Sequence, residues 1–361
     1  MAIKGHLTLD TGRILFFAAA IAAVGPLALL TACSSSSSSS SSHLAYVAGG
    51  QTSVVGLRIS ASGAAQTIIG SPFTAGNGPS SIVVDPSNKF LYVANQGEDT
   101  ISLFTIDGNS GGLTEVLPRT PTGTSPAAMV MDRGGSFLYV GTQGSVEAFS
   151  IGGSGSLTPA GSVAPLAASP SGLTLSSSGN FLYVSAPGVS AIYVFAVSSG
   201  TLTQVGSPAI VPGGVATLAI DPAGAFLFVP NPSANDVTVL KISSTGTLSV
   251  GPGTFPTSTS PVAAATDLSG KYLYVANFGS PTVNQFSYDS AGTLTTLTAS
   301  SPSAGTNSTF IVPDPNGKFI YVGNQGSSSI TEFSLNSDGT LAPTTNSITL
   351  GIQPRSLAIE K

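Results

Sequence analysis

The chain has 361 residues, of which 41% are hydrophobic and only 7% are charged, with 43 glycines and 25 prolines. A formal charge of −5 and the absence of any Lys/Arg cluster argue against nucleic acid as a partner. Hydrophobic residues at period two favour a packed all-β fold over disorder, and the single cysteine has no partner for a disulfide within the chain.

Residues 1–33 are predicted to be a lipoprotein signal peptide. Lys4 and Arg13 precede an apolar run at 14–30, and the sequence Leu-Thr-Ala-Cys that ends at Cys33 resembles a bacterial lipobox. In that motif the thiol receives a diacylglyceryl group and cleavage makes the cysteine the new N-terminus. An ordinary secretory peptide, or a membrane-spanning anchor with an incidental cysteine, is the alternative. We therefore expect lipidation at Cys33 and an extracytoplasmic location in the cell envelope, in the periplasm or at the cell surface.

Residues 34–42 are nine consecutive serines. A serine tract has no apolar side chains to bury and behaves as a flexible linker. We expect it to tether a single domain, residues 43–361, to the membrane.

Within that domain an aromatic residue followed by valine returns seven times, at intervals of 44 to 47 residues. This is the period of a four-stranded propeller blade. The sequence therefore predicts a seven-bladed β-propeller, an all-β fold. The aromatic positions are Tyr46, Tyr92, Tyr139, Tyr183, Phe228, Tyr274 and Tyr321.

Two further residue types recur at nearly fixed distances from the aromatic and mark the turns of the units. Each set of equivalent residues, one from each unit, is here called a column. A glycine stands 16 to 19 residues after each aromatic, where a hairpin needs a residue of positive φ. In units two to seven, Asp or Ser stands seven residues before the aromatic, where Asp-Pro chemistry predicts a capped type I turn. The glycines are Gly63, Gly111, Gly155, Gly200, Gly246, Gly292 and Gly339. The turn residues are Asp85, Asp132, Ser176, Asp221, Asp267 and Asp314.

The two ends of the domain complement each other. The first unit begins at His43 without an inner strand, and residues 354–360 form an inner strand without an aromatic strand after it. We expect the C-terminal strand to complete the N-terminal blade, which closes the ring and hides both sheet edges.

The repeated motif, with best copies such as Asp-Pro-Asn-Gly-Lys-Phe-Ile-Tyr-Val-Gly-Asn from Asp314, resembles the seven-bladed lactonase-like propellers. That group contains bacterial 6-phosphogluconolactonase and the carboxymuconate cyclases, and YVTN-repeat surface proteins are related to it. The resemblance covers residues 43–361 and is specific for the fold and the repeat class, because the matching residues are turn and strand residues that every blade needs. In those enzymes a Gly-Pro-Arg-His segment at the start of an inner strand helps form the active site. Here Pro354 and Arg355 keep the Pro-Arg pair, but Ser356 stands where the histidine would be.

The sequence offers few side chains that could act in catalysis or bind a metal. After cleavage one histidine remains, His43, outside any blade motif, so neither a His-assisted hydrolysis nor a His-rich metal site can be assembled. The acids of the turn column are expected to cap their own turns. We therefore assign no catalytic residue, no metal and no cofactor.

Polar residues in the loops after the aromatic strands are the candidate ligand site, together with Arg355. Amides around a central channel suit a small molecule, a glycan or a protein segment. The alternative is that each Asn ends its strand with a local side-chain bond. The candidates are Arg355, Asn95, Gln96, Glu98, Asp99, Asn231, Asp236, Asn277, Asn324 and Gln325.

Two functions follow from these observations. The first is a monomeric, lipid-anchored propeller that binds a ligand or partner; the second is an exported lactonase that uses carboxylates and Arg355 instead of histidine. The missing Arg-His pair and the export signal favour binding. Fold alone does not decide whether the chain is an enzyme.

Overall fold

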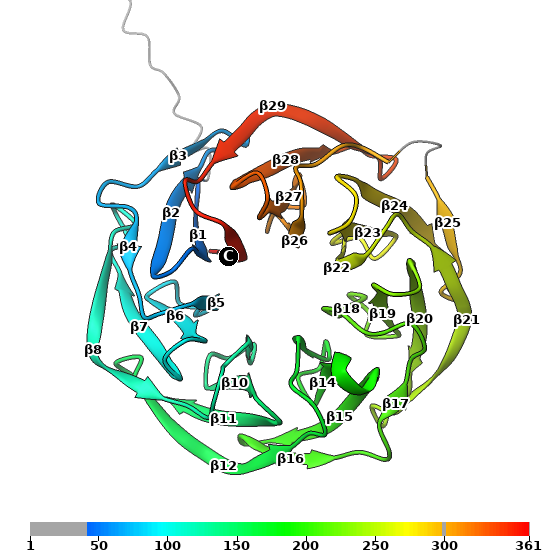
Figure 1. The fold of residues 1–361 in the computed structure, drawn as a ribbon, viewed down its shortest axis with the longest axis horizontal. Helices are drawn as coiled ribbons and strands as arrows, with labels where there is room; N and C mark the ends of the chain where they lie inside the picture. The colour runs from blue at the N-terminus through cyan, green and yellow to red at the C-terminus, as the bar shows by residue number, and fades with distance from the viewer. Residues whose placement is uncertain (1–41, 298–300, 361) are drawn as a thin grey trace, which may run out of the picture. The chain divides into compact units, whose positions relative to one another are not determined.

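The computed structural model describes residues 42–297 and 301–360, which form a ring of seven β-sheets, here called blades 1 to 7 (Figure 1). The predicted all-β propeller is thereby confirmed. The predictions for the signal peptide, for Cys33 and for nearly all of the serine tether lie outside the described residues. Among the residues described, no helix is long and apolar enough to cross a membrane.

Each blade is an antiparallel sheet whose strands follow one another from the channel to the outside. The strands of blades 1 to 3 are, from the inside outward, β30 (Pro354–Ile359), β1 (His43–Gly49), β2 (Ser53–Ile59) and β3 (Ala65–Thr67), with β4 (Phe73–Thr74) also on β2; β5 (Pro79–Val84), β6 (Phe90–Asn95), β7 (Thr100–Ile106) and β8 (Leu113–Pro121); β9 (Ala128–Met131), β10 (Phe137–Thr142), β11 (Ser145–Ile151) and β12 (Leu157–Pro165).

The remaining blades repeat this order. Blade 4 also carries a short 3-10 helix, η1 (Pro187–Val189), and an extra strand on β15, β17 (Ala209–Ile210). The strands of blades 4 to 7 are β13 (Gly172–Leu175), β14 (Phe181–Ala186), β15 (Ala191–Ser198) and β16 (Thr201–Gln204); β18 (Ala219–Ile220), β19 (Phe226–Asn231), β20 (Asp236–Ile242) and β21 (Leu248–Pro256); β22 (Pro261–Thr266), β23 (Tyr272–Asn277), β24 (Val283–Tyr288) and β25 (Leu294–Thr296); β26 (Ser308–Pro313), β27 (Phe319–Asn324), β28 (Ser329–Leu335) and β29 (Leu341–Thr349).

The aromatic column and the glycine column belong together because they join neighbouring blades. The aromatic side chains are fully buried between blades, and the hydroxyl of Tyr46 donates to the carbonyl of Gly111 in the next blade at 2.9 Å. Tyr92 and Tyr274 make the same bond to the hairpin glycine of the blade that follows. All seven glycines have the positive φ expected of the hairpin. Each blade therefore contributes one phenyl or phenol ring and receives another from its neighbour.

The acidic column caps turns, as expected. In the turn that follows β5, Oδ1 of Asp85 accepts the backbone N–H groups of Lys89 and Phe90 at 2.8 and 2.7 Å. Asp267 repeats this pair of bonds in blade 6. Because each carboxylate is used inside its own turn, the column does not form a common site.

The C-terminal strand closes the ring. β30 pairs with β1, with Leu357 opposite Val47, and the N–H of Glu360 donates to the carbonyl of Leu44 at 2.9 Å. Figure 1 shows this last strand on the channel side of β1. The predicted closure is confirmed, and it covers the inner edge of the N-terminal strand β1 with the C-terminal strand.

Candidate functional site

The start of each inner strand is where the ring presents side chains to the channel. In four blades the residue after the first position of this strand is a β-bulge, an extra residue with no partner on the neighbouring strand. These bulge residues are Ser80, Val262, Thr309 and Arg355. A bulge turns its side chain out of the regular alternation, and here it places Ser80, Thr309 and Arg355 on the channel cavity.

The bulge hydroxyls and Arg355 behave differently. Ser80 donates to the carbonyl of Pro126 in the next blade at 2.7 Å, and Thr309 donates likewise to Pro354 at 2.9 Å. The hydroxyls of Ser80 and Thr309 therefore link the inner strands of neighbouring blades by hydrogen bonds. The guanidinium of Arg355 is exposed and reaches Oε1 of Gln96 in blade 2 at 3.4 Å.

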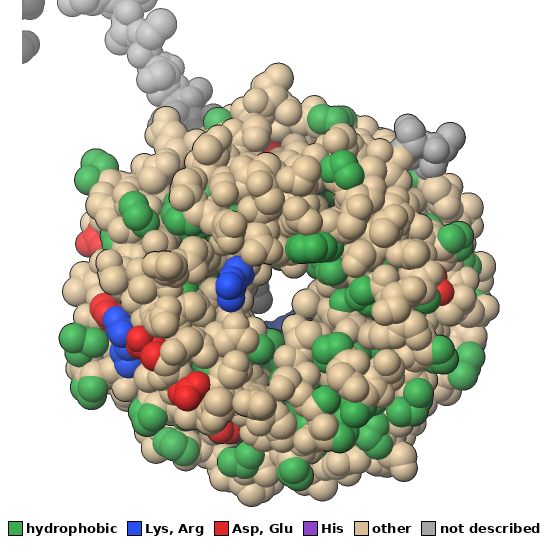
Figure 2. Space-filling model, in the orientation of Figure 1, with side chains coloured by type: hydrophobic (Ala, Val, Ile, Leu, Met, Phe, Trp, Pro, Cys, Tyr) green, Lys and Arg blue, Asp and Glu red, His purple; other side chains and the backbone are tan. Residues whose placement is uncertain are grey.

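A cavity of about 320 Å³ opens at this mouth of the channel, lined by residues of all seven blades that lie in the inner strands or directly before them. Its polar lining consists of hydroxyl groups from residues such as Ser171 and Thr217, and Arg355 is the only charged residue among the lining side chains that the structure describes. Figure 2 shows a basic side chain at the edge of the channel, with the acidic side chains of this face lying farther out. The mouth is therefore a hydroxyl-lined cavity with one positive charge.

The four asparagines of the predicted site lie inside the blades and do not line this cavity. Asn95, Asn231, Asn277 and Asn324 are all 0% exposed. Nδ2 of Asn95 donates to Thr100 and Ser102 in the next strand, at 3.1 and 3.0 Å, and the other three make comparable bonds within their own blades. The local role of Asn is thus what the structure displays, because the second strand of a blade ends one strand away from the channel.

The predicted acidic residues are used in loop contacts. Glu98 forms an ion pair with Arg119 at 2.6 Å and accepts the backbone N–H of Asn77; this backbone bond, with help from Arg119, lowers the pKa of Glu98. Asp99 accepts the N–H of Ser125 at 2.6 Å. Asp236 likewise accepts from an amide, at 2.5 Å, in its own blade. Glu98 and Asp99 therefore join their loop to the loops that lead into β5 and β9, and Asp236 holds the end of the strand before it.

The two predicted glutamines are half-buried, and each contacts a residue at or next to the start of β30. Gln96 contacts the guanidinium directly, and Nε2 of Gln325 donates to Oε1 of Gln353 at 3.4 Å. Gln353 was not among the residues that the sequence indicated. Its position directly before Pro354, at the start of an inner strand, is the signal that would have found it.

His43, the histidine among the described residues, does not reach the Arg355 cavity. His43 contacts Asn316, which follows β26, whereas the cavity mouth lies at the opposite end of that strand, where Ser308 begins it. Burial raises the pKa of Tyr139 and Tyr183 to about 12, so these phenols stay neutral and are poor proton acceptors. Within the described ranges, no cluster of His, Cys, Asp and Glu has the makings of a metal site.

Several solved structures share this fold. A Bacteroides fragilis protein provisionally assigned as a 6-phosphogluconolactonase matches with a TM-score of 0.79 and 21% identity, over 90% of this chain and 99% of that one. The periplasmic gluconolactonase of Pseudomonas aeruginosa matches with a TM-score of 0.76 and 20% identity, over 89% and 99%. A Lactobacillus plantarum protein matches with a TM-score of 0.77 and 19% identity, over 89% and 100%. At these identities the similarity supports the fold alone.

Sequence comparison places the chain in a family. No curated protein sequence matches it significantly. The family described as lactonase, seven-bladed beta-propeller, matches residues 45–170, 158–265 and 258–361, which together span nearly the whole ring. The chain therefore belongs to the lactonase family of seven-bladed β-propellers.

Proposed function

We propose that this propeller binds a small anionic ligand, such as a sugar acid, at the mouth that carries Arg355. The observation that supports the proposal is the composition of the cavity: one exposed guanidinium, and hydroxyl groups from the inner strands around it. A guanidinium suits the two oxygens of a carboxylate, and hydroxyls suit the hydroxyls of a polyol. The volume of about 320 Å³ is within the range of small-ligand sites.

Binding without hydrolysis accounts best for this set of residues. Lactone hydrolysis needs a group that takes a proton from water as well as a group that stabilises the oxyanion. Arg355 supplies the second, but none of the described lining residues supplies the first, because the cavity holds neither a carboxylate nor an imidazole.

Lactone hydrolysis remains the second candidate, on the strength of the family and of the similarity to a protein named as a periplasmic gluconolactonase. In that case the candidate base is the exposed Glu98, which stands two residues after Gln96, the residue that touches Arg355. Glu98 would have to leave its ion pair with Arg119 to act as a base.

We also propose that the protein is lipid-anchored through Cys33 in the cell envelope. The apolar segment 14–30, the Leu-Thr-Ala-Cys sequence and the serine tract support this proposal. An extracytoplasmic position would give the cavity access to ligands outside the cytoplasm.

The binding proposal is tested by calorimetry with gluconate and by following glucono-1,5-lactone hydrolysis with the same protein. We expect gluconate to bind and Arg355→Gln to weaken it at least about tenfold, while lactone disappears at the spontaneous rate. The control is Lys241→Gln, which removes the same charge from an exposed position on β20. A catalysed hydrolysis that Arg355→Gln abolishes would instead establish the lactonase, and gluconate affinity equal in both variants would refute the site.

A further inference from the structure

The opposite mouth of the channel, formed by the Asp turns, carries a break in the repeat. The residue after the turn Asp or Ser is proline in blades 2, 5 and 7, at Pro86, Pro222 and Pro315, and is uncharged in blades 4 and 6, at Ser177 and Leu268, but blade 3 has Arg133 in this place. Proline presets the turn and adds no charge. A guanidinium here is therefore not required by the turn itself.

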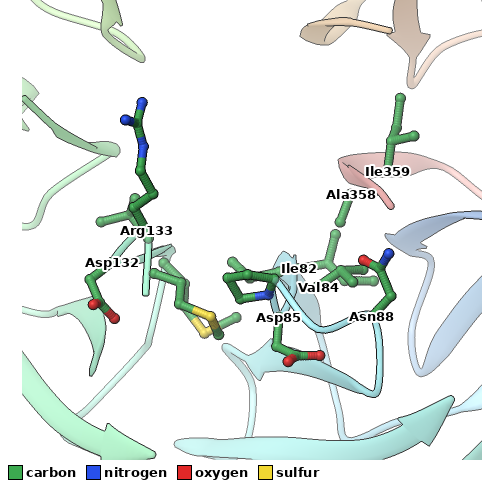
Figure 3. Close-up of a pocket in the computed structure, with 13 residues that line it drawn as sticks. Ile82, Val84, Asp85, Asn88, Asp132, Arg133, Ala358 and Ile359 are labelled. Atoms are coloured by element: carbon green, nitrogen blue, oxygen red, sulfur yellow. The ribbon is translucent and has the colours of Figure 1, made fainter. Parts of the chain in front are cut away.

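The charge of Arg133 is not neutralised by the acid beside it. Oδ1 of Asp132 accepts the N–H groups of Ser136 and Phe137, at 2.7 and 2.5 Å, within the turn. Figure 3 shows the guanidinium of Arg133 pointing away from the Asp132 carboxylate. Both ion pairs found among the described residues belong to Arg119, and Arg133 is exposed.

Arg133 stands on a cavity of about 240 Å³ between blades 1, 2 and 3. The walls are apolar inner-strand side chains, with Met129 and Met131 from blade 3 facing residues of β5 and the end of β30. Methionine is flexible and adapts to irregular apolar ligands. The cavity thus combines an adaptable apolar wall with a cation at its rim.

One other acid, Asp85, lines this cavity, and its charge is already compensated. Its oxygens accept the N–H groups of Ser87, Lys89 and Phe90 at 3.0, 2.8 and 2.7 Å. Figure 3 shows its carboxylate directed to the side opposite the Arg133 guanidinium, with the Asn88 amide on the far wall. The polar group that faces the open part of the cavity from blade 3 is therefore the guanidinium.

We propose that this turn-side mouth is a second ligand site, which takes a small monocarboxylate with a short apolar chain. The carboxylate pairs with Arg133, and the chain lies against Met129 and Met131. This site is separate from the cavity of Arg355, although Met129 borders both cavities. Met131 lines the turn-side cavity and not the Arg355 cavity, so its signal distinguishes the turn-side mouth from the cavity of Arg355. Met131 and Arg133 also border a neighbouring cavity toward blades 4 and 5, on the same turn side of the ring.

The full chain has three methionines, so the methyl resonances of labelled methionine give a direct readout. We would titrate hexanoate and, as the uncharged match, hexan-1-ol. Hexanoate is expected to shift the Met131 signal in a saturable manner. Replacing Arg133 is expected to weaken this binding at least about tenfold.

Arg133 is replaced in two different ways, so that a loss of binding is not mistaken for misfolding of one variant. Arg133→Gln keeps the length of the side chain, and Arg133→Pro restores the residue that three other turns use. Arg355→Gln should leave the Met131 titration unchanged, which separates this site from the proposed function. The proposal is overturned if hexan-1-ol binds as well as hexanoate, if both Arg133 variants bind like the wild type, or if no saturable Met131 shift occurs.

Discussion

The replacement Glu332→Gln is expected to stabilise the ring at neutral pH, because Glu332 is a buried acid at the joint between blades 7 and 1. Its side chain is 0% exposed, Oε1 accepts from the amide of Asn346 at 3.2 Å, and Oε2 has no hydrogen-bond partner among the described residues. A Cβ on Gly63 in blade 1 would collide with the carboxylate, so the group fills the interface.

Blade 6 carries an uncharged polar side chain at the same position. Gln285 occupies the equivalent place, opposite Tyr274 as Glu332 is opposite Tyr321. Oε1 of Gln285 accepts the N–H of Leu341 in the next blade at 2.6 Å. A glutamine at 332 can accept in the same manner and can donate to the hydroxyl of Tyr321, which is buried without a partner among the described residues.

The effect should depend on pH. Burial raises the pKa of Glu332, so the folded protein holds this proton more tightly than the unfolded chain does. Stability is therefore lost as pH rises from the unfolded pKa of about 4.3 through the raised folded pKa, and the loss is complete above it. Glu332→Gln removes this loss, so its advantage is small near pH 4 and largest at neutral pH and above.

The expected gain in the free energy of unfolding follows from Oε2 of Glu332, the oxygen without a hydrogen-bond partner. An unsatisfied buried polar group costs about 1–3 kcal/mol, and each kcal/mol shifts Tm by roughly 2–4 °C in a large domain. Thermal unfolding of Glu332→Gln and of the reverse change, Gln285→Glu, measures it; the latter should destabilise at neutral pH. Equal Tm values for wild type and Glu332→Gln at neutral pH, or a difference that does not shrink toward pH 4, would refute the reasoning.

Three other outcomes are expected. Cys33→Ser should leave an unprocessed, unlipidated precursor, and mass spectrometry of the mature N-terminus checks this; a mature chain that starts elsewhere would contradict it. Deleting 355–361 should lower Tm far more than deleting 34–42, since the first removes most of the closing strand, and equal melts would disprove the closure. Gly246→Ala should cost about 1–3 kcal/mol more than Gly206→Ala, because both have positive φ but only at Gly246 does a Cβ meet an aromatic ring; equal losses would exclude the ring contact.

The fold was predictable because each blade solves the same packing problem. The aromatic, glycine and aspartate columns recur since an aromatic ring such as Tyr46 packs against the hairpin glycine of the next blade and Asp85 caps its own turn, and most blades repeat these contacts. Because these packing contacts and turn caps need the same residue types in successive blades, they appear as a periodic pattern in the sequence. The closing role of residues 354–360 was visible for the same reason.

The candidate site was only partly predictable. Asn95 and Gln96 are neighbours at the end of one strand, yet the first is fully buried and the second reaches Arg355. Which of them faces solvent depends on how the loop folds back, through bonds such as Asn95 to Thr100, and single-sequence patterns do not contain that information. Gln353 was missed because it belongs to a loop column that has no fixed residue type.

The residues with candidate functions are those that differ in chemistry from the residues at the equivalent places of other blades. Arg355 stands where two other bulges carry hydroxyl residues that bind the next blade, and Arg133 stands where three turns carry proline. In both places the blade folds without the charge, so the charge is free to serve a ligand. Glu332 is also an unusual residue at its place in the repeat, but its side chain is buried, so the desolvated carboxylate lowers the stability of the fold instead of binding a ligand. Exposure on a cavity therefore separates a substitution that offers a binding group from one that strains the interface between blades.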